Sequence, residues 1–226
     1  MDVANLASQL NVGVDLPEGK VVTTLLVVLV GDLVAGRAST RWTPYAAMLG
    51  LFLAIVAQVY QWDTATPLSF LGSYIGDDLS IVFRGIIVLS AIATISMSIR
   101  YVEQSGTSLA EFLVILMTAA LGGMFLAGAN DLVTIFVALE TLSISSYLLT
   151  GYMKRDPRSN EAALKYLLIG AASSAIFLYG MSLLYGLSGG KMQLLEISQS
   201  LVVSDSDAPI GLVIALVFVI AGIAFK

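Results

Sequence analysis

Two ionisable side chains lie inside apolar stretches of this sequence, and the chemistry that suits them is the movement of protons or ions. Glu140 is near the middle of one stretch, and Lys165 lies within the next. A charged side chain at the centre of a bilayer costs roughly 2.5–3.5 kcal/mol on insertion scales. A membrane segment with no use for such a charge is more stable without it, so both residues are candidate functional groups.

Glu140 is too far from either end of its stretch to reach water. It follows Asp131 by nine residues and precedes Lys154 by fourteen, or about 14 Å and 21 Å along a helix. Ser143 and Tyr147 share its helix face and can stabilise its charge or relay a proton. The competing interpretation is a neutral Glu that only holds helices together. Function is favoured, because Ser or Thr can supply packing hydrogen bonds without a titrating group.

Lys165 follows Arg158 by seven residues on the next, antiparallel stretch. The short connection makes the two stretches neighbours, so we expect Glu140 and Lys165 at comparable depth, as a coupled pair. Two alternatives remain open. The side chain of Lys165 can extend toward the interface, or it can pair with Glu161, four residues earlier.

Two further charges allow an interfacial interpretation. Lys226 follows Pro209 by seventeen residues, about 25 Å along a helix, which brings it near the far interface. Arg84 stands about six residues into another apolar stretch and is expected to pair with Asp77 or Asp78 at the membrane surface.

The composition identifies a membrane protein. Of 226 residues, 58% are hydrophobic and 12% are charged, and the mean hydropathy is +0.90, whereas soluble domains are about a quarter charged. The sequence has no Cys and no His, which removes disulfides, iron–sulfur ligands and the usual haem and metal ligands. Redox chemistry is therefore expected on another chain. A pI near 4.6 argues against a nucleic-acid partner.

The hydropathy pattern predicts an all-α, polytopic helix bundle. We expect seven spans, at roughly 20–36, 45–61, 79–99, 109–128, 131–152, 160–186 and 209–226. Basic residues favour alternate loops: Arg37, Arg41, Arg100, Lys154, Arg155 and Arg158 on one side, and Lys20 and Lys191 on the other. By the positive-inside rule the first group is cytoplasmic and the N-terminus is not.

Small residues and turn residues give two more predictions. Gly122, Gly123 and Gly128 in the fourth span, and residues 170–175 and Gly180 in the sixth, should permit close helix packing. Asp156-Pro157 should cap the start of the sixth span. Lys226 follows an apolar run without a polar flank, so we expect further spans after it.

Three stretches carry a family resemblance: LGGMFLAGANDLVTIFVALETLSISSYLLTGY, KRDPRSNEAALKYLLIGAASSAIFLYGMSLLYG and the final GIAFK. They resemble the subunit 2 family of cyanobacterial and chloroplast NAD(P)H-quinone oxidoreductases (photosynthetic complex I), which is antiporter-like and related to Mrp-type antiporters. The resemblance implies about fourteen spans built on two inverted repeats. Residues 1–226 would form one membrane domain, with 1–108 as three peripheral helices and 109–226 as part of the first repeat.

The resemblance also implies roles. Glu140, Lys165 and Lys226 match the family's glutamate on span five, lysine on span six and lysine on a broken span seven, which move protons; Ser143 and Tyr147 would support them. The expected function is proton translocation in a ferredoxin- or NAD(P)H-dependent plastoquinone reductase of the cyanobacterial thylakoid membrane. This chain would hold no cofactor, while other subunits would hold the iron–sulfur clusters and bind plastoquinone.

The expected partners are other membrane and peripheral subunits, including neighbouring antiporter-like ones, the lipid bilayer, and ferredoxin through other subunits. Two alternatives remain at this point. One is an Mrp-type cation/proton antiporter subunit, and the other is a structural membrane anchor without a transport role.

Overall fold

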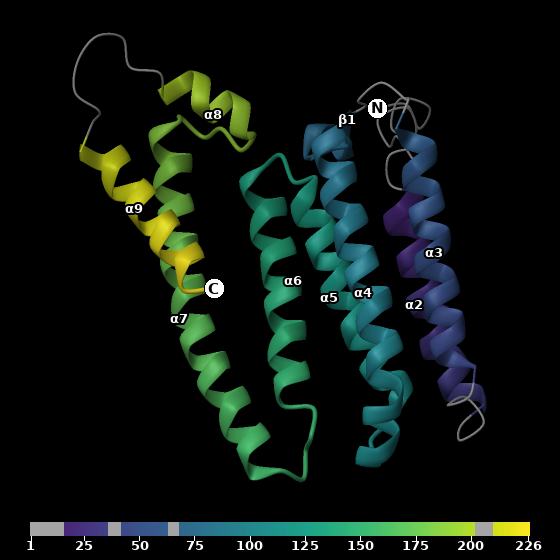
Figure 1. The fold of residues 1–226 in the computed structure, drawn as a ribbon. Coiled ribbons are helices and arrows are strands. Elements are labelled where there is room, and N and C mark those ends of the chain that lie inside the picture. Colours follow the sequence, from purple (N-terminus) through teal and green to yellow (C-terminus); the bar gives the residue numbers. More distant parts are fainter. Residues whose placement is uncertain (1–15, 36–41, 63–67, 202–209) are drawn as a thin grey trace.

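A computed structural model describes residues 16–35, 42–62, 68–201 and 210–226 as a bundle of long helices (Figure 1). The long helices are α2 (Leu16–Ala35), α3 (Thr43–Gln61), α4 (Asp78–Ser105), α5 (Leu109–Ala127), α6 (Leu132–Thr150), α7 (Pro157–Leu187) and α9 (Ile210–Ala224). They correspond one to one to the predicted spans, so the all-α, multi-pass membrane fold is confirmed.

Five of these helices, α3 to α7, are long and apolar enough to cross a membrane. α2 differs because Glu18, Lys20 and Asp32 stand within it. α9 differs because it has only 15 residues, about 22 Å at 1.5 Å per residue.

Side-chain caps define where four of the helices begin. The carboxylates of Asp77, Asp131 and Asp156 and the hydroxyl of Ser108 each accept a hydrogen bond from a backbone N–H in the first turn of α4, α6, α7 and α5 respectively. Such caps satisfy amides that have no partner within the helix. The predicted cap at Asp156-Pro157 is confirmed.

Two small elements lie between the predicted spans. One is a hairpin of β1 (Leu68–Ser69) and β2 (Tyr74–Ile75), paired antiparallel and joined by the short helix η2 (Phe70–Gly72). The other is α8 (Leu194–Leu201), which buries Ile197. Both are too short for a hydropathy window to detect.

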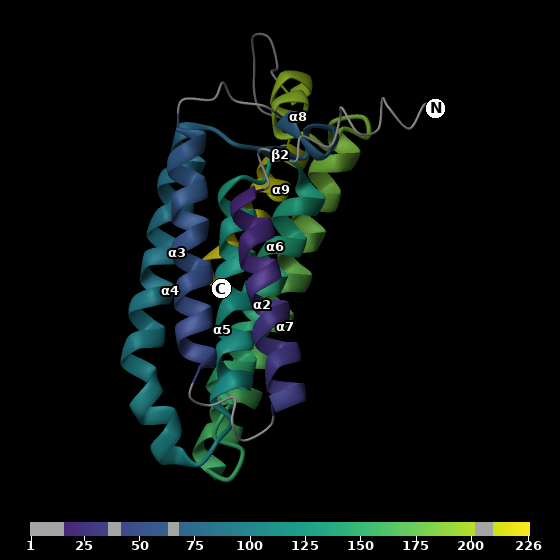
Figure 2. The same cartoon turned by 90° about the vertical axis from the view of Figure 1, so that its right-hand side faces the viewer.

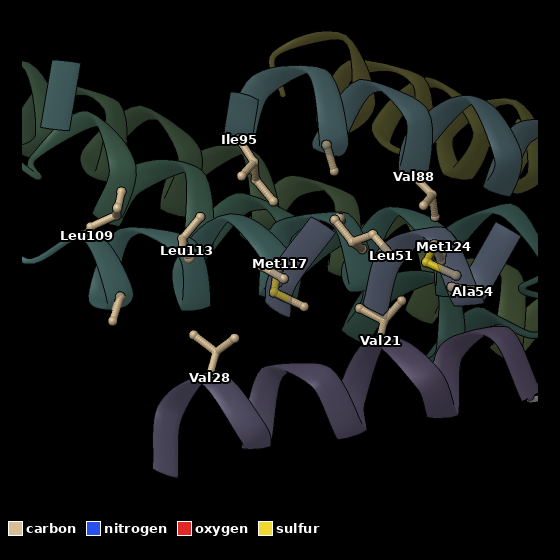
Figure 3. Packing of buried hydrophobic residues seen from close by; sticks show 14 of the residues in the cluster. Val21, Val28, Leu51, Ala54, Val88, Ile95, Leu109, Leu113, Met117 and Met124 are labelled. Carbon is tan, nitrogen blue, oxygen red and sulfur yellow. The ribbon is translucent and has the colours of Figure 1, made fainter. Parts of the chain in front are cut away.

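The main core lies among α2, α3, α4 and α5. Figure 3 shows side chains from these four helices converging: Val21, Val28, Leu51, Ala54, Val88, Ile95, Leu109, Leu113, Met117 and Met124. A smaller cluster of Leu132, Phe177, Met181 and Ile197 joins α6, α7 and α8. In Figure 1, α5 stands between α3 on one side and α6, α7 and α9 on the other, and in Figure 2 α3 and α4 lie side by side along one edge.

The two ends of the bundle differ. The turns at 105–108 and 151–156 meet at one end, where Lys154 lies 3.7 Å from Glu111, whereas the hairpin and α8 lie at the other (Figure 1). This agrees with the alternation predicted from the basic residues, although Arg37 and Arg41 are outside the described residues. Which end faces the cytoplasm stays a prediction.

Candidate functional site

An ion pair inside the bundle joins Glu140 to Lys226. The Lys226 ammonium donates to Oε1 of Glu140, and the two side chains are only 5% and 22% exposed. Figure 1 shows that α9 lies along α7 and that Lys226, two residues beyond α9, is at mid-height of the bundle. Lys226 therefore points into the bundle, and the expectation that it lies near the far interface is wrong.

Ser174 on α7 completes this site. Its Oγ lies 2.6 Å from Oε1 of Glu140 and 2.9 Å from the carbonyl oxygen of Gly170. Oε1 thus receives both an ammonium and a hydroxyl donor. Sequence reasoning missed Ser174 as a functional candidate because it treated the run 170–175 only as a packing surface. The signal was present, since serine at a buried helix crossing can donate where alanine cannot.

Lys165 is placed elsewhere. It is 69% exposed and lies 2.5 Å from Glu161, one turn earlier on α7. The predicted close pair of Glu140 and Lys165 is therefore absent from the described structure, and the alternative of pairing with Glu161 is the one observed. Glu140 meets α7 at Ser174, nine residues beyond Lys165. Nine residues correspond to about 13 Å and a rotation of about 180°, so Lys165 differs from that contact in both depth and direction.

The two supporting polar residues lie where the sequence predicted. Ser143 is buried and donates to the carbonyl of Leu139 at 2.7 Å. The Tyr147 hydroxyl is buried and has no hydrogen bond of good geometry within the described ranges, although Ser143 and Glu140 interact with it electrostatically. Their shared face with Glu140 is confirmed, while a role in proton relay stays a prediction.

Glycines set the spacing of the helices around the site. A Cβ on Gly122 of α5 would lie 2.7 Å from the Leu142 backbone nitrogen of α6, and one on Gly180 of α7 would lie 2.7 Å from that of Val219 on α9. The predicted close packing at these glycines is confirmed. A Cβ on Gly170 would lie 1.9 Å from the Tyr147 hydroxyl. The close approach of α6 and α7 therefore also requires that residue 170 be a glycine.

A second buried ion pair joins α2 to α4. Arg84 lies 3.0 Å from Oε1 of Glu18, with side chains 0% and 2% exposed. The Tyr74 hydroxyl donates to the same oxygen at 2.6 Å, and two guanidinium nitrogens donate to Ser80. The expected surface pairing of Arg84 is wrong: Asp77 caps α4 instead, and the partner comes from a helix 66 residues away.

An open cleft of about 920 Å³ lies at the end of the bundle that holds Lys154, between the turn before α5 and the segment before α7. Tyr152 donates from this segment to the carbonyl oxygen of Ser108. Burial, and then the nearby Glu111 carboxylate, raise the pKa of Tyr152. Among the described residues, no three Asp or Glu side chains converge as they would around a metal ion.

Residues 129–226 match the family described as "NADH:quinone oxidoreductase/Mrp antiporter, TM". The whole chain is 67% identical to NAD(P)H-quinone oxidoreductase subunit 2 of Trichormus variabilis, covering 44% of that protein. It is 69% identical to the protein of the same name from Synechococcus elongatus, covering 43%. The chain thus spans less than half the length of these curated relatives.

Two solved structures are similar. A chain of respiratory complex I from Thermus thermophilus with bound aureothin is 29% identical, with a TM-score of 0.72; the match covers 92% of this chain and 43% of that one. A chain of an archaeal membrane-bound sulfane sulfur reductase has a TM-score of 0.80 at 18% identity, covering 93% and 44%. The second match supports the fold alone.

Proposed function

The chain belongs to the family of antiporter-like membrane subunits that includes NAD(P)H-quinone oxidoreductase subunit 2, and on that premise we propose that it carries part of a proton pathway centred on Glu140 and Lys226. One observation carries the proposal. Residues 86 apart in the sequence form an ion pair inside an apolar bundle, and a buried charge pair is weak evidence for stability alone.

The pair can bind and release protons if its partners separate. Apart from each other in a low-dielectric interior, a carboxylate and an ammonium are each more stable uncharged. The carboxylate of Glu140 then takes up one proton, and Lys226 gives one up. When the pair re-forms, the carboxylic acid releases its proton and the amine binds one.

Lys165 is proposed as an entrance group of the same pathway. It lies about 13 Å along α7 from the contact with Glu140, toward the end of the bundle that holds Lys154. Its pair with Glu161 lies on the surface of the described bundle, outside the contact between Glu140 and Lys226. Ser143 and Tyr147 line the buried face between this level and Glu140.

In the whole complex, this pathway would couple electron transfer to proton pumping. We propose ferredoxin or NAD(P)H as the electron donor and plastoquinone as the acceptor, in a thylakoid membrane, with all redox cofactors on other subunits. The partners would be the neighbouring membrane and peripheral subunits. The names of the cyanobacterial relatives, which match this chain over all of its residues, support a complex that uses NAD(P)H and a quinone.

The test is Glu140→Gln in the assembled complex, with proton translocation and quinone reduction measured in the same membranes. We expect the number of protons moved per electron to fall, because the residue has no redox role. Glu103→Gln, on an exposed position of α4, is the control. Normal pumping by Glu140→Gln at normal complex abundance would favour a structural anchor. Pumping that requires sodium ions would favour a cation/proton antiporter.

A further inference from the structure

One hydroxyl in the proton site faces two competing acceptors. The Ser174 Oγ lies 2.6 Å from Oε1 of Glu140 and 2.9 Å from the carbonyl oxygen of Gly170. A serine hydroxyl has a single hydrogen to donate, so it serves one acceptor at a time. A bond to an ionised carboxylate is roughly twice as strong as one to a neutral carbonyl. The charge on Glu140 therefore decides where the hydrogen points.

We infer that Ser174 is a positioning residue that holds Glu140 in its charged form, and that its hydroxyl turns to the Gly170 carbonyl when Glu140 is protonated. The inference rests on the proposed function, because it assigns a control element to the same site. This change in hydrogen bonding breaks and forms no covalent bond. Rotation about one side-chain bond exchanges a charge-assisted hydrogen bond for one within the helix, of the kind that helical serines commonly make.

The adjacent serine shows that α7 supports both partners of the ion pair. The Ser173 hydroxyl donates at 2.6 Å to the carbonyl of Gly222 on α9, four residues before Lys226. Ser173 thus fixes the helix that carries the ammonium, while Ser174 holds the carboxylate on α6. Two consecutive side chains of one helix therefore bond to Glu140 and to the helix that precedes Lys226.

The other charged and titratable groups around Glu140 come from α9, α6, α7 and α5. Lys226 faces it from α9, and Tyr147 interacts with it from α6. The exposed pair of Lys165 and Glu161 lies about 13 Å along α7. α5 packs against α6 and carries a single charged residue, Glu111, in its first turn. Within the described residues, Ser174 is the neutral donor that bonds directly to the carboxylate.

The inference predicts a change in the pH profile of pumping. A hydrogen bond to a carboxylate favours its charged form, so Ser174→Ala should move the pH profile of pumping upward. We expect the pH of half-maximal proton translocation to rise by roughly one unit. Ser174→Thr keeps the hydroxyl and should restore the wild-type profile, which loss of packing alone would not explain.

The experiment uses the complete complex reconstituted in liposomes, with initial rates of proton translocation and quinone reduction measured over a pH series. Ser182→Ala is the matched control, because Ser182 lies on the same helix, is exposed and donates to the carbonyl oxygen of Tyr179 on that helix. An upward shift in Ser174→Ala, with wild-type profiles for Ser174→Thr and Ser182→Ala, supports the inference.

Two results would overturn it. One is an unshifted profile in Ser174→Ala while Glu140→Gln abolishes pumping, which leaves the proposed function intact. The other is normal pumping by Glu140→Gln, which removes both proposals together. If Ser174→Ala does not accumulate, Ser174→Cys retains the volume with a weaker donor, and an unshifted profile in that variant overturns the inference equally.

Discussion

Arg84 binds Glu18 at 3.0 Å, and both side chains are almost completely shielded from solvent. The pair belongs to a larger connection, because Tyr74 donates to the same carboxylate oxygen from the hairpin. The hairpin continues the connection through backbone bonds from Ile75 to Gly128 and from Asn130 to Ser73. The peripheral helices are thereby tied to the turn from which α6, the helix of Glu140, begins.

Removing one member of this pair should damage the subunit more than removing both. Arg84→Met leaves a buried carboxylate without its cation, and breaking a buried pair in this way costs about 3–5 kcal/mol. We expect low abundance of the subunit and a lower melting temperature of the complex. The double variant Arg84→Met, Glu18→Gln should recover part of the loss, because no lone charge remains.

Immunoblots of assembled complex and thermal unfolding curves measure the effect. Arg100→Met is the control, because that arginine is exposed at the other end of α4. A double variant no more stable than Arg84→Met would show that the pair is not an energetic unit.

Gly170 is expected to be essential for the packing of α6 against α7, because the Tyr147 ring lies where a side chain of residue 170 would be. A Cβ there would lie 1.9 Å from the hydroxyl and 2.5 Å from the ring carbon that bears it. Gly170→Ala should therefore displace Tyr147 and separate α6 from α7, and pumping should fall together with abundance. Gly186→Ala, on the same helix with no atom near the added carbon, should be neutral or stabilising by up to about 1 kcal/mol. Equal behaviour of the two variants would contradict the packing argument.

The helices could be predicted from the sequence because each of them depends on local properties. Apolar length and capping residues such as Asp156 act within one segment. The partners of the buried charges could not be predicted in the same way. Depth along a helix suggested Lys165 as the partner of Glu140, but it ignored the rotation of about 180° between Lys165 and Ser174. The pairing of Arg84 with Glu18 depends on how separate helices pack together, and the spacing of residues in the sequence does not predict that packing.

The sidedness of the bundle gives a prediction that uses the absence of cysteine from this chain. Lys154→Cys should be labelled by an impermeant maleimide from the cytoplasmic side, and Lys191→Cys from the opposite side, because the basic loops alternate. Both side chains are more than half exposed. Labelling in sealed membranes of each orientation, with the unsubstituted chain as the blank, measures the topology. Reaction of Lys154→Cys from the non-cytoplasmic side alone would reverse the orientation.

The last prediction separates the ion pair from the entrance group by a double-mutant cycle. Glu140→Gln and Lys226→Ala each destroy the same pair, so their combined effect on proton translocation should be much smaller than the sum of the separate effects in free energy. Lys165→Ala should reduce pumping less, because Lys165 pairs with Glu161 rather than with Glu140. Its effect should add to that of Lys226→Ala within about 0.5 kcal/mol, as is usual for separated sites without shared partners.

The measured quantity is the rate of proton translocation per complex, with quinone reduction as the internal reference. Strong coupling of Lys165 to Lys226 would require Lys165 to approach the ion pair during turnover, in an arrangement different from the one described.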